Sequence, residues 1–199
     1  MTIVSPFFIF PPISWWAQVI NAETIIFDKD EHFQKMTARN RYDISGANNR
    51  IKLSIPLTKG REQRIVMSDV IIYNEERWQV QHWRTLVSVY KRSPFFDHYE
   101  DSLKTLFETP FTHLTAFNLA SVIWVKEQLK LDFNIQQTEN YIREYPKEII
   151  DLRHAKNSFP ATIKYYQVFE DRIGFQPDLS ILDLMFSEGP VSVNKLRGK

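Results

Sequence analysis

The chain has 199 residues, of which 43% are hydrophobic and 14% aromatic, and its formal net charge is +1. The apolar content is sufficient for a packed core, and the near-neutral charge gives no global attraction to nucleic acid or to a membrane surface. The chain contains no cysteine, which excludes disulfides and thiolate chemistry and is typical of a reducing compartment. We therefore expect a cytoplasmic protein with residues 1–199 in a single domain.

The first 28 residues predict a strand, a short helix and a second strand. Residues 2–9 are a β-prone run that ends at the proline pair 11–12, because proline cannot continue a central strand. Ser14 offers an N-cap for the helix WWAQVIN, and residues 23–28 form a second apolar run of strand length. This order is typical of a βαβ unit with parallel strands. The initial apolar run is too short to cross a bilayer, so we expect no integral membrane segment.

Residues 41–73 predict three more strands. RYDISGANNRIKLSIPL, residues 41–57, has two short strand patterns around a turn at 46–49. IVMSDVIIY, residues 65–73, has the length and composition of a third strand. Together with the N-terminal unit, these strands predict a central mixed sheet.

From residue 76 the apolar period becomes helical. It predicts helices over residues 76–90, after the Ser93–Pro94 pair, and over 112–129. Further along, FNIQQ has the pattern of a strand, and ENYIREYPKEIIDL predicts a helix before Pro146. Ser180 is the expected N-cap of a last helix that ends at Gly189. The predicted fold is α/β: an N-terminal βαβ unit, a central mixed sheet packed by several helices, and a helical C-terminal half. Residues 1–75 are mainly sheet with a basic loop edge, and residues 76–199 mainly helical.

The positive charge is concentrated in one zone. Residues 34–64 hold eight cations and two acidic residues, a net charge of +6 that leaves −5 for the rest of the chain. A local basic zone favours a small anion over a long polyanion, because the arginine fork binds phosphate or carboxylate bidentately. For the cations from Arg50 onward we favour an exposed hairpin face. Arg39 and Arg41 are as well explained by an anion site, since they follow the second predicted strand.

His32 is the strongest candidate for a general base. It follows the second predicted strand, and open α/β sheets bind ligands at the carboxyl ends of their strands. Histidine has an ordinary pKa of about 6.5, which suits proton transfer. The alternative is an exposed loop histidine. Lys35 follows in the same stretch, EHFQKMTARNR, and Gln34 and Asn40 would orient polar groups of a substrate.

His82 is a second catalytic candidate. It lies within the apolar stripe of the helix predicted at 76–90, where a half-buried core histidine is an equally good interpretation. Trp83 and Arg84 would line the same wall of the binding site as His82. The histidines form no close ligand pair and no thiolate can assist them, so we expect no metal site.

Four stretches of the chain carry a family resemblance. They are FPPISWWA, DKDEHFQKMTARNRYDISGANNRIKLSIPL, QHWRTLVSVYKRSPFFDHYED and YYQVFEDRIGFQPDLSILDLMFSEGP. In this order, over nearly the whole chain, they resemble the shorter branch of the WbqC-like protein family. The resemblance implies a bacterial protein of O-antigen or other surface-polysaccharide gene clusters, and a transferase of glycine or a related amino acid. It also adds weight to His82, because the QHW triplet is part of it.

The leading hypothesis is a cytoplasmic group transferase in surface-polysaccharide biosynthesis. Lys35, Arg39 and Arg41 would hold a phosphate- or carboxylate-bearing small-molecule substrate, and His32 would act as the base. Such clamps accelerate transfer by positioning the substrate and neutralising its charge.

Two other functions stay open. One is a non-catalytic module that binds a nucleotide or sugar phosphate, and the other is an interaction protein with FFIFPP and the Trp15–Trp16 pair at its surface. Nucleic-acid binding ranks below these, because the chain has no reader motif. The sequence does not identify a cofactor.

Overall fold

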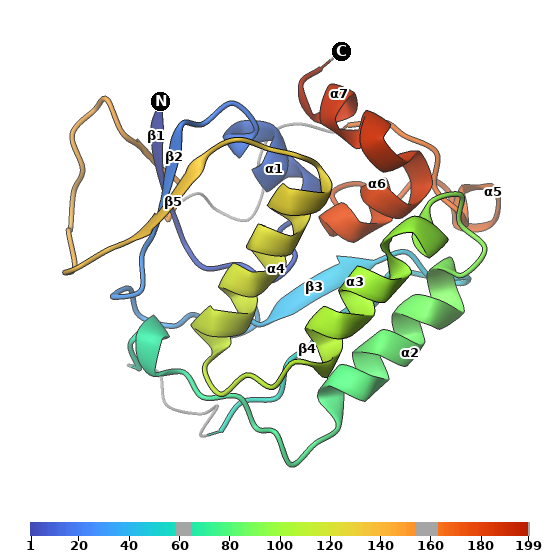
Figure 1. The fold of residues 1–199 in the computed structure, drawn as a ribbon, viewed down its shortest axis with the longest axis horizontal. Coiled ribbons are helices and arrows are strands. Elements are labelled where there is room, and N and C mark those ends of the chain that lie inside the picture. Colours follow the sequence, from blue (N-terminus) through green and yellow to red (C-terminus); the bar gives the residue numbers. More distant parts are fainter. Residues whose placement is uncertain (59–64, 154–162, 199) are drawn as a thin grey trace.

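Four parallel strands form the main sheet of the computed structural model, which describes residues 1–58, 65–153 and 163–198 (Figure 1). The strands are β1 (Thr2–Ser5), β2 (Thr24–Phe27), β5 (Asn134–Gln137) and β6 (Ile150–Asp151), in the order β5-β2-β1-β6. Helix α1 (Ile13–Val19) connects β1 to its parallel neighbour β2. This arrangement confirms the βαβ unit and the α/β class.

The first strand is shorter than predicted. It ends at Ser5 because β1 pairs with a strand on each side, and Pro6 has no N–H to continue the ladder. Helix α1 begins after Pro12, so Ser14 is buried inside the first turn and makes no side-chain cap.

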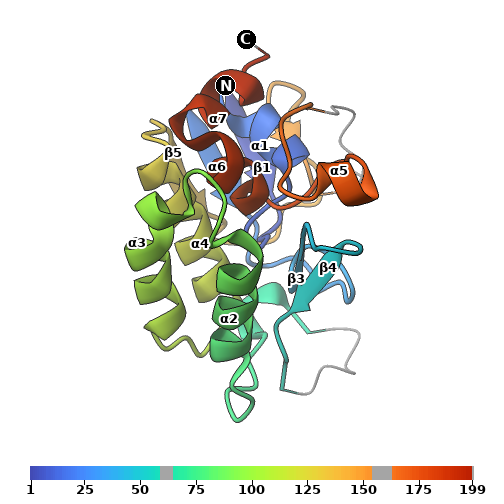
Figure 2. The same cartoon turned by 90° about the vertical axis from the view of Figure 1, so that its right-hand side faces the viewer.

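Strands β3 (Arg41–Ile44) and β4 (Ile51–Ser54) form an antiparallel hairpin, as predicted. The hairpin is a separate two-stranded sheet, so parallel and antiparallel pairing are divided between two sheets. Its turn requires Gly46, because a Cβ there would lie 2.6 Å from the carbonyl oxygen of Asn49. Figure 2 shows the hairpin beside α2.

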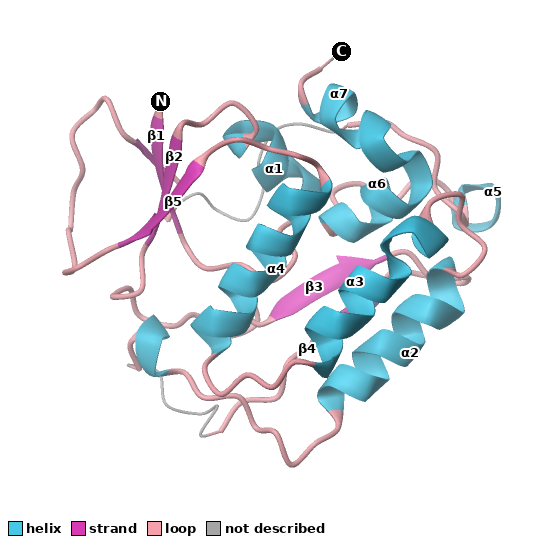
Figure 3. Cartoon of the chain, in the orientation of Figure 1, coloured by secondary structure: helices cyan, strands magenta, loops and turns pink. Residues whose placement is uncertain are grey.

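The helices α2 (Trp78–Tyr90), α3 (Phe96–Glu108) and α4 (Leu114–Gln128) confirm the helical period, and α3 packs against both α2 and α4 (Figure 3). The face of α4 that carries Leu114, Phe117 and Val125 is buried. At its centre, the ring of Phe10 contacts Phe117 and Trp124 edge to face. The loop after β1 is therefore anchored in the core between the sheet and the helices.

The start of α3 differs from the prediction. The helix begins at Phe96, after Phe95, and the Ser93 hydroxyl donates to the carbonyl oxygen of Tyr90 at 2.6 Å. Ser93 therefore serves the end of α2 and does not cap α3.

Two predicted elements are wrong. Residues 65–73 contain the 3₁₀ helix η1 (Met67–Asp69) and isolated bridges to Leu57 and His113, because this segment pairs with different partners along its length. Residues 138–149 form no helix before Pro146. The carbonyl oxygens of Ile142 and Arg143 accept hydrogen bonds from the Arg153 side chain instead of from helical N–H groups.

The C-terminal segment contains α5 (Glu170–Ile173), α6 (Ile181–Glu188), the 3₁₀ helix η2 (Gly189–Val191) and α7 (Ser192–Leu196). The Ser180 hydroxyl caps α6 by accepting from the N–H of Leu182 at 3.3 Å, as predicted. Asp183 does not complete a capping box, because its buried carboxylate accepts the hydroxyls of Tyr90 and Tyr165. Among the described residues, no helix is long and apolar enough to cross a membrane.

Candidate functional site

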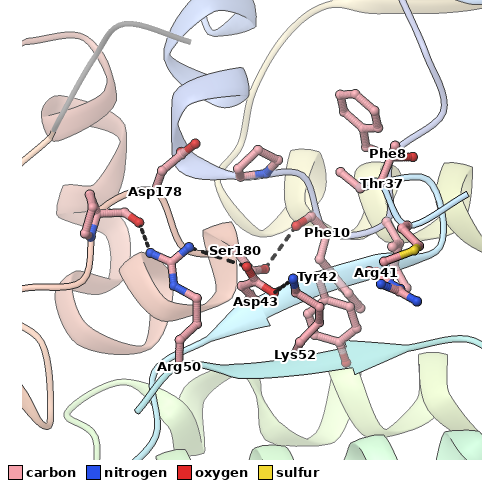
Figure 4. Close-up of a pocket in the computed structure, with 15 residues that line it drawn as sticks. Phe8, Phe10, Thr37, Arg41, Tyr42, Asp43, Arg50, Lys52, Asp178 and Ser180 are labelled. Carbon is pink, nitrogen blue, oxygen red and sulfur yellow. Dashed lines mark hydrogen bonds and ion pairs between the residues drawn. The ribbon is translucent and has the colours of Figure 1, made fainter. Parts of the chain in front are cut away.

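A cavity of about 440 Å³ is enclosed by the loops that follow β1 and β2, by the hairpin, and by the segment that leads into α6 (Figure 4). Its walls come from residues 8–12 after β1, residues 36–38 after β2, the hairpin at 41–52, and residues 177–180. The loops after β1 and β2 leave the parallel sheet at its carboxyl end, where open α/β sheets bind ligands. The volume is suitable for a small molecule.

Backbone contacts hold these walls together. The N–H of Ile9 donates to the carbonyl oxygen of Ala38 at 3.0 Å, which joins the loops after β1 and β2. The N–H of Ser180 donates to the carbonyl oxygen of Asp43 at 2.8 Å, and its hydroxyl donates to that of Phe10 at 3.0 Å. The cavity is thus built from segments that are far apart in the sequence but directly bonded to one another.

Asn118 on α4 supports two of the walls from behind. Its buried side-chain amide donates to the carbonyl oxygen of Phe7 at 3.1 Å and to that of Arg39 at 2.8 Å. Nearby, the hydroxyl of Ser121 accepts the N–H of Phe10 at 3.1 Å. One face of α4 therefore sets the position of the loops after β1 and β2, which both line the cavity.

Three cations line the cavity, and two of them share a carboxylate. Arg50 Nη1 lies 3.4 Å from Asp43 Oδ2, and Lys52 Nζ lies 4.0 Å from Asp43 Oδ1. Arg50 also donates to the carbonyl oxygen of Pro177 (Figure 4). Arg50 and Lys52, which the sequence favours as part of an exposed hairpin face, therefore belong to the cavity wall.

Arg41 is the cation without an acidic partner among the cavity residues that the structure describes. Its Nε is buried and makes no hydrogen bond to any described residue. A buried donor without an acceptor is unfavourable. The interpretation of Arg41 as an anion ligand stays a prediction.

Arg39 is placed differently from its neighbour. Its guanidinium donates to Glu31 at 2.8 and 2.6 Å, and its carbon Cζ lies 5.7 Å from the centre of the Phe8 ring. Burial raises the pKa of Glu31 above its ordinary value, although the ion pair with Arg39 opposes that shift. Since Arg39 is buried and paired, it supports the cavity wall through Phe8. Asn40 is also buried and donates to the carbonyl oxygen of Ile55 at 3.4 Å.

His32, Gln34 and Lys35 lie outside the cavity lining. His32 and Gln34 are exposed, and Lys35 is half-buried. The backbone of His32 forms a bridge with Val66, which fixes the beginning of the loop whose end lines the cavity. The structure therefore does not bring these side chains together with Arg41.

His82 is buried on α2. Its Nε2 lies 3.2 Å from the carbonyl oxygen of Ser54, and its Nδ1 lies 3.2 Å from the hydroxyl of Tyr42. Because a carbonyl only accepts, Nε2 carries the proton and Nδ1 accepts from Tyr42. Burial lowers the pKa of His82 to about 4. His82 is therefore neutral at neutral pH, and it touches the cavity only through Tyr42.

The two residues after His82 do not reach the cavity. Trp83 packs on Phe96 and Phe107, with ring centres 6.1 and 6.3 Å away, and Arg84 is exposed.

A second polar cluster joins three strand ends of the parallel sheet. Arg153 Nη1 lies 2.7 Å from Asp28, which follows β2, and Nη2 lies 2.6 Å from Asp151 in β6. Thr138, which follows β5, donates to Asp30 at 2.7 Å. This cluster was not predicted from the sequence, although a polar residue directly after a predicted strand, such as Thr138 after FNIQQ, was a usable signal. In the described part of the chain, no group of three His, Asp or Glu side chains could hold a metal ion.

Residues 8–157 match the family model of the WbqC-like protein family. The match includes three of the four wall segments of the cavity, and the fourth, residues 177–180, lies beyond it. No curated protein and no solved structure matches the chain.

Proposed function

The chain belongs to the WbqC-like protein family, and from this premise we propose that it is a cytoplasmic group transferase of surface-polysaccharide biosynthesis. Its substrate would be a small molecule with a phosphate or carboxylate group, bound in the cavity beside the hairpin. The family resemblance supports the biological setting. The cavity supports the anionic substrate.

The observation that carries the proposal is the position of Arg41. It lines the cavity, and its buried Nε has no acceptor among the described residues. Arg50 and Lys52 line the same cavity and have Asp43 between them. A phosphate or carboxylate would accept from Arg41 in the bidentate geometry that guanidinium prefers. The two partnered cations would add attraction at longer range.

The other candidate residues take different parts in this proposal. Arg39 holds Phe8 in place, and Asn40 fixes the chain before the hairpin. His32 stays the proposed general base, with Gln34 and Lys35 beside it. It begins the loop that ends at the cavity, so it would act on a part of the substrate that extends out of the cavity.

Titration calorimetry with inorganic phosphate, acetate and a panel of nucleotide sugars tests the binding step. We expect Arg41→Ala to weaken the binding of the anionic probes tenfold or more, because a hydrogen bond to a charged group contributes about 1.5–3 kcal/mol. Arg84→Ala is the matched control, since Arg84 is exposed and lies outside the cavity. Equal affinity of the Arg41→Ala variant and the unmodified protein would overturn the anion site.

A second candidate function is a binding module without catalysis. It is favoured by one observation: no histidine among the described residues lines the cavity. Mass spectrometry of nucleotide sugars incubated with the protein and with glycine as the second substrate separates the two functions. A transferase changes the bound compound and loses that turnover, but not its affinity, in His32→Ala. A binding module leaves the compound unchanged in both proteins.

A further inference from the structure

The two ends of the cavity differ in chemistry. Figure 4 shows Phe8 and Thr37 at one end, whereas Asp178, Arg50 and Asp43 lie toward the other. Met36 and Ala38, the apolar lining residues on either side of Thr37, belong to this first end, and Ala38 is bonded to Ile9 next to Phe8. Arg41 lies nearer to this apolar end than Arg50 does in the same view. The cation without an acidic partner therefore adjoins an apolar surface.

Met36 is the most exposed large apolar side chain in the described residues, with 72% of its surface accessible. A single exposed apolar residue is ordinary on a protein surface, but this one lines the same cavity as Phe8. Its backbone also has a φ of +60°, a conformation that non-glycine residues adopt uncommonly. The loop thus places an unbranched, polarisable side chain at the mouth of the cavity, where it can adapt to the shape of a ligand.

Phe8 is held rigidly at the same end. The guanidinium of Arg39 lies over its ring, and the buried ion pair with Glu31 fixes that guanidinium. The carbonyl oxygen of the preceding residue, Phe7, is bonded to Asn118. A ligand group that contacts Phe8 therefore meets a surface that is already ordered, which reduces the entropic cost of binding.

From this division we infer that the ligand is amphipathic: its anionic group binds Arg41, and a flat apolar group attached to it packs against Phe8 and Met36. This inference rests on the proposed anion site and narrows its ligand class. The cavity of about 440 Å³ is larger than a phosphate needs, and the apolar group accounts for the remaining space next to Arg41. A simple inorganic anion would use only part of the site.

Titration calorimetry with phenyl phosphate, inorganic phosphate and phenol tests the inference. We expect phenyl phosphate to bind at least tenfold more tightly than inorganic phosphate, and phenol to show no measurable binding. Met36→Gln keeps the length of the side chain but removes its apolar end. This variant should bind phenyl phosphate several-fold more weakly, and its affinity for inorganic phosphate should be unchanged. Val80→Gln, at an exposed apolar position of α2 outside the cavity, is the control and should change neither.

The outcomes separate this inference from the proposed function. If both phosphates bind equally and both are lost in Arg41→Ala, the anion site stands and the apolar subsite is wrong. The apolar subsite is also wrong if Met36→Gln and the unmodified protein bind phenyl phosphate equally. If neither phosphate binds at millimolar concentration, both proposals are wrong. A tenfold preference that Met36→Gln removes supports both.

Discussion

Arg39 and Glu31 form a bidentate ion pair inside the protein, with nitrogen–oxygen distances of 2.8 and 2.6 Å and side chains that are only 3% and 8% exposed. The pair joins the two ends of the loop that follows β2. It changes the role expected for Arg39, because a carboxylate occupies the Nε–Nη2 edge of the guanidinium and the side chain is buried outside the cavity lining. Arg39 instead supports Phe8 at the cavity wall.

Removal of one partner of this ion pair should destabilise the protein strongly. Glu31→Ala leaves the Arg39 charge buried without a partner, and we expect the free energy of unfolding to fall by about 3–5 kcal/mol. A double variant, Glu31→Met with Arg39→Met, should lose less, because no charge remains buried. Urea unfolding measures both. Lys91→Ala is the control, since the Lys91 ion pairs are exposed and should contribute at most about 1 kcal/mol. A double variant less stable than Glu31→Ala would contradict this prediction.

His82 should make the protein sensitive to acid. Burial lowers the pKa of His82 to about 4, while in the unfolded chain it returns to about 6.5. Between pH 6.5 and pH 4 the unfolded state therefore binds a proton at this residue more readily than the folded state. The contribution of neutral His82 to stability is fully present above pH 6.5 and is lost as the pH falls toward 4. The loss attributable to His82 should reach about 3 kcal/mol.

The measurement is the free energy of unfolding from pH 8 to pH 4.5 for the unmodified protein and His82→Gln. The variant should lose less stability over this range, whatever its stability at pH 8. His98→Gln, which replaces an exposed histidine on α3, should follow the unmodified protein. Parallel pH profiles for His82→Gln and the unmodified protein would refute the prediction.

Gly189 should not tolerate a side chain. Its φ is +57°, and a Cβ at this position would overlap the ring of Phe95. Gly174→Ala is a matched control, because Gly174 has a φ of +71° but nothing within 4 Å of its Cβ position. Both variants have the unfavourable backbone conformation, and only Gly189→Ala has the steric overlap. We expect Gly189→Ala to be about 1–3 kcal/mol less stable than Gly174→Ala in urea unfolding. Equal stability of the two variants would show that Phe95 moves aside freely.

Asn118 should affect both stability and ligand binding. Asn118→Ala leaves the carbonyl oxygens of Phe7 and Arg39 without their buried donor, and each lost partner costs about 1–3 kcal/mol. We therefore expect a loss of at least about 2 kcal/mol in the free energy of unfolding. The affinity for phenyl phosphate should also decrease, because Phe7 and Arg39 adjoin the two loops that form the Phe8 end of the cavity.

Gln79→Ala is the matched control for Asn118. The Gln79 amide also donates to a carbonyl oxygen, that of Thr109 at 2.7 Å, but this bond is exposed, so water can replace it. This variant should change stability little and phenyl phosphate affinity not at all. The positioning role of Asn118 would be contradicted if the affinity stayed unchanged in Asn118→Ala under conditions where the variant is folded.

Local patterns in the sequence were sufficient for most of the elements. The strand–helix–strand order of residues 2–28, the hairpin and the helical period after residue 76 were all confirmed, because each depends on the spacing of apolar residues within one element. Ser180 and Gly189 marked the two ends of α6 correctly, since a helix cap is a contact between near neighbours. The sequence also located the basic zone that forms part of the cavity.

Segments with mixed partners were not predictable in this way. Residues 65–73 have a strand-like composition, but they form isolated bridges to three separate segments, at His32, Leu57 and His113. Residues 139–145 have a helical composition, yet the Arg153 side chain donates to the carbonyl oxygens of Ile142 and Arg143. In both cases long-range partners, which no local window contains, overrode the local preference.

For the site, the sequence by itself determined which side chains are chemically able to bind an anion, and it placed them after the second strand. Only the tertiary structure decided which of these cations has a partner. Arg39 and Arg41 are two residues apart, yet Arg39 is paired with Glu31 while Arg41 lines a cavity whose fourth wall comes from residues 177–180. The physical reason is that the charge of a side chain is a property of the residue, whereas its burial and pairing depend on what the rest of the chain brings next to it.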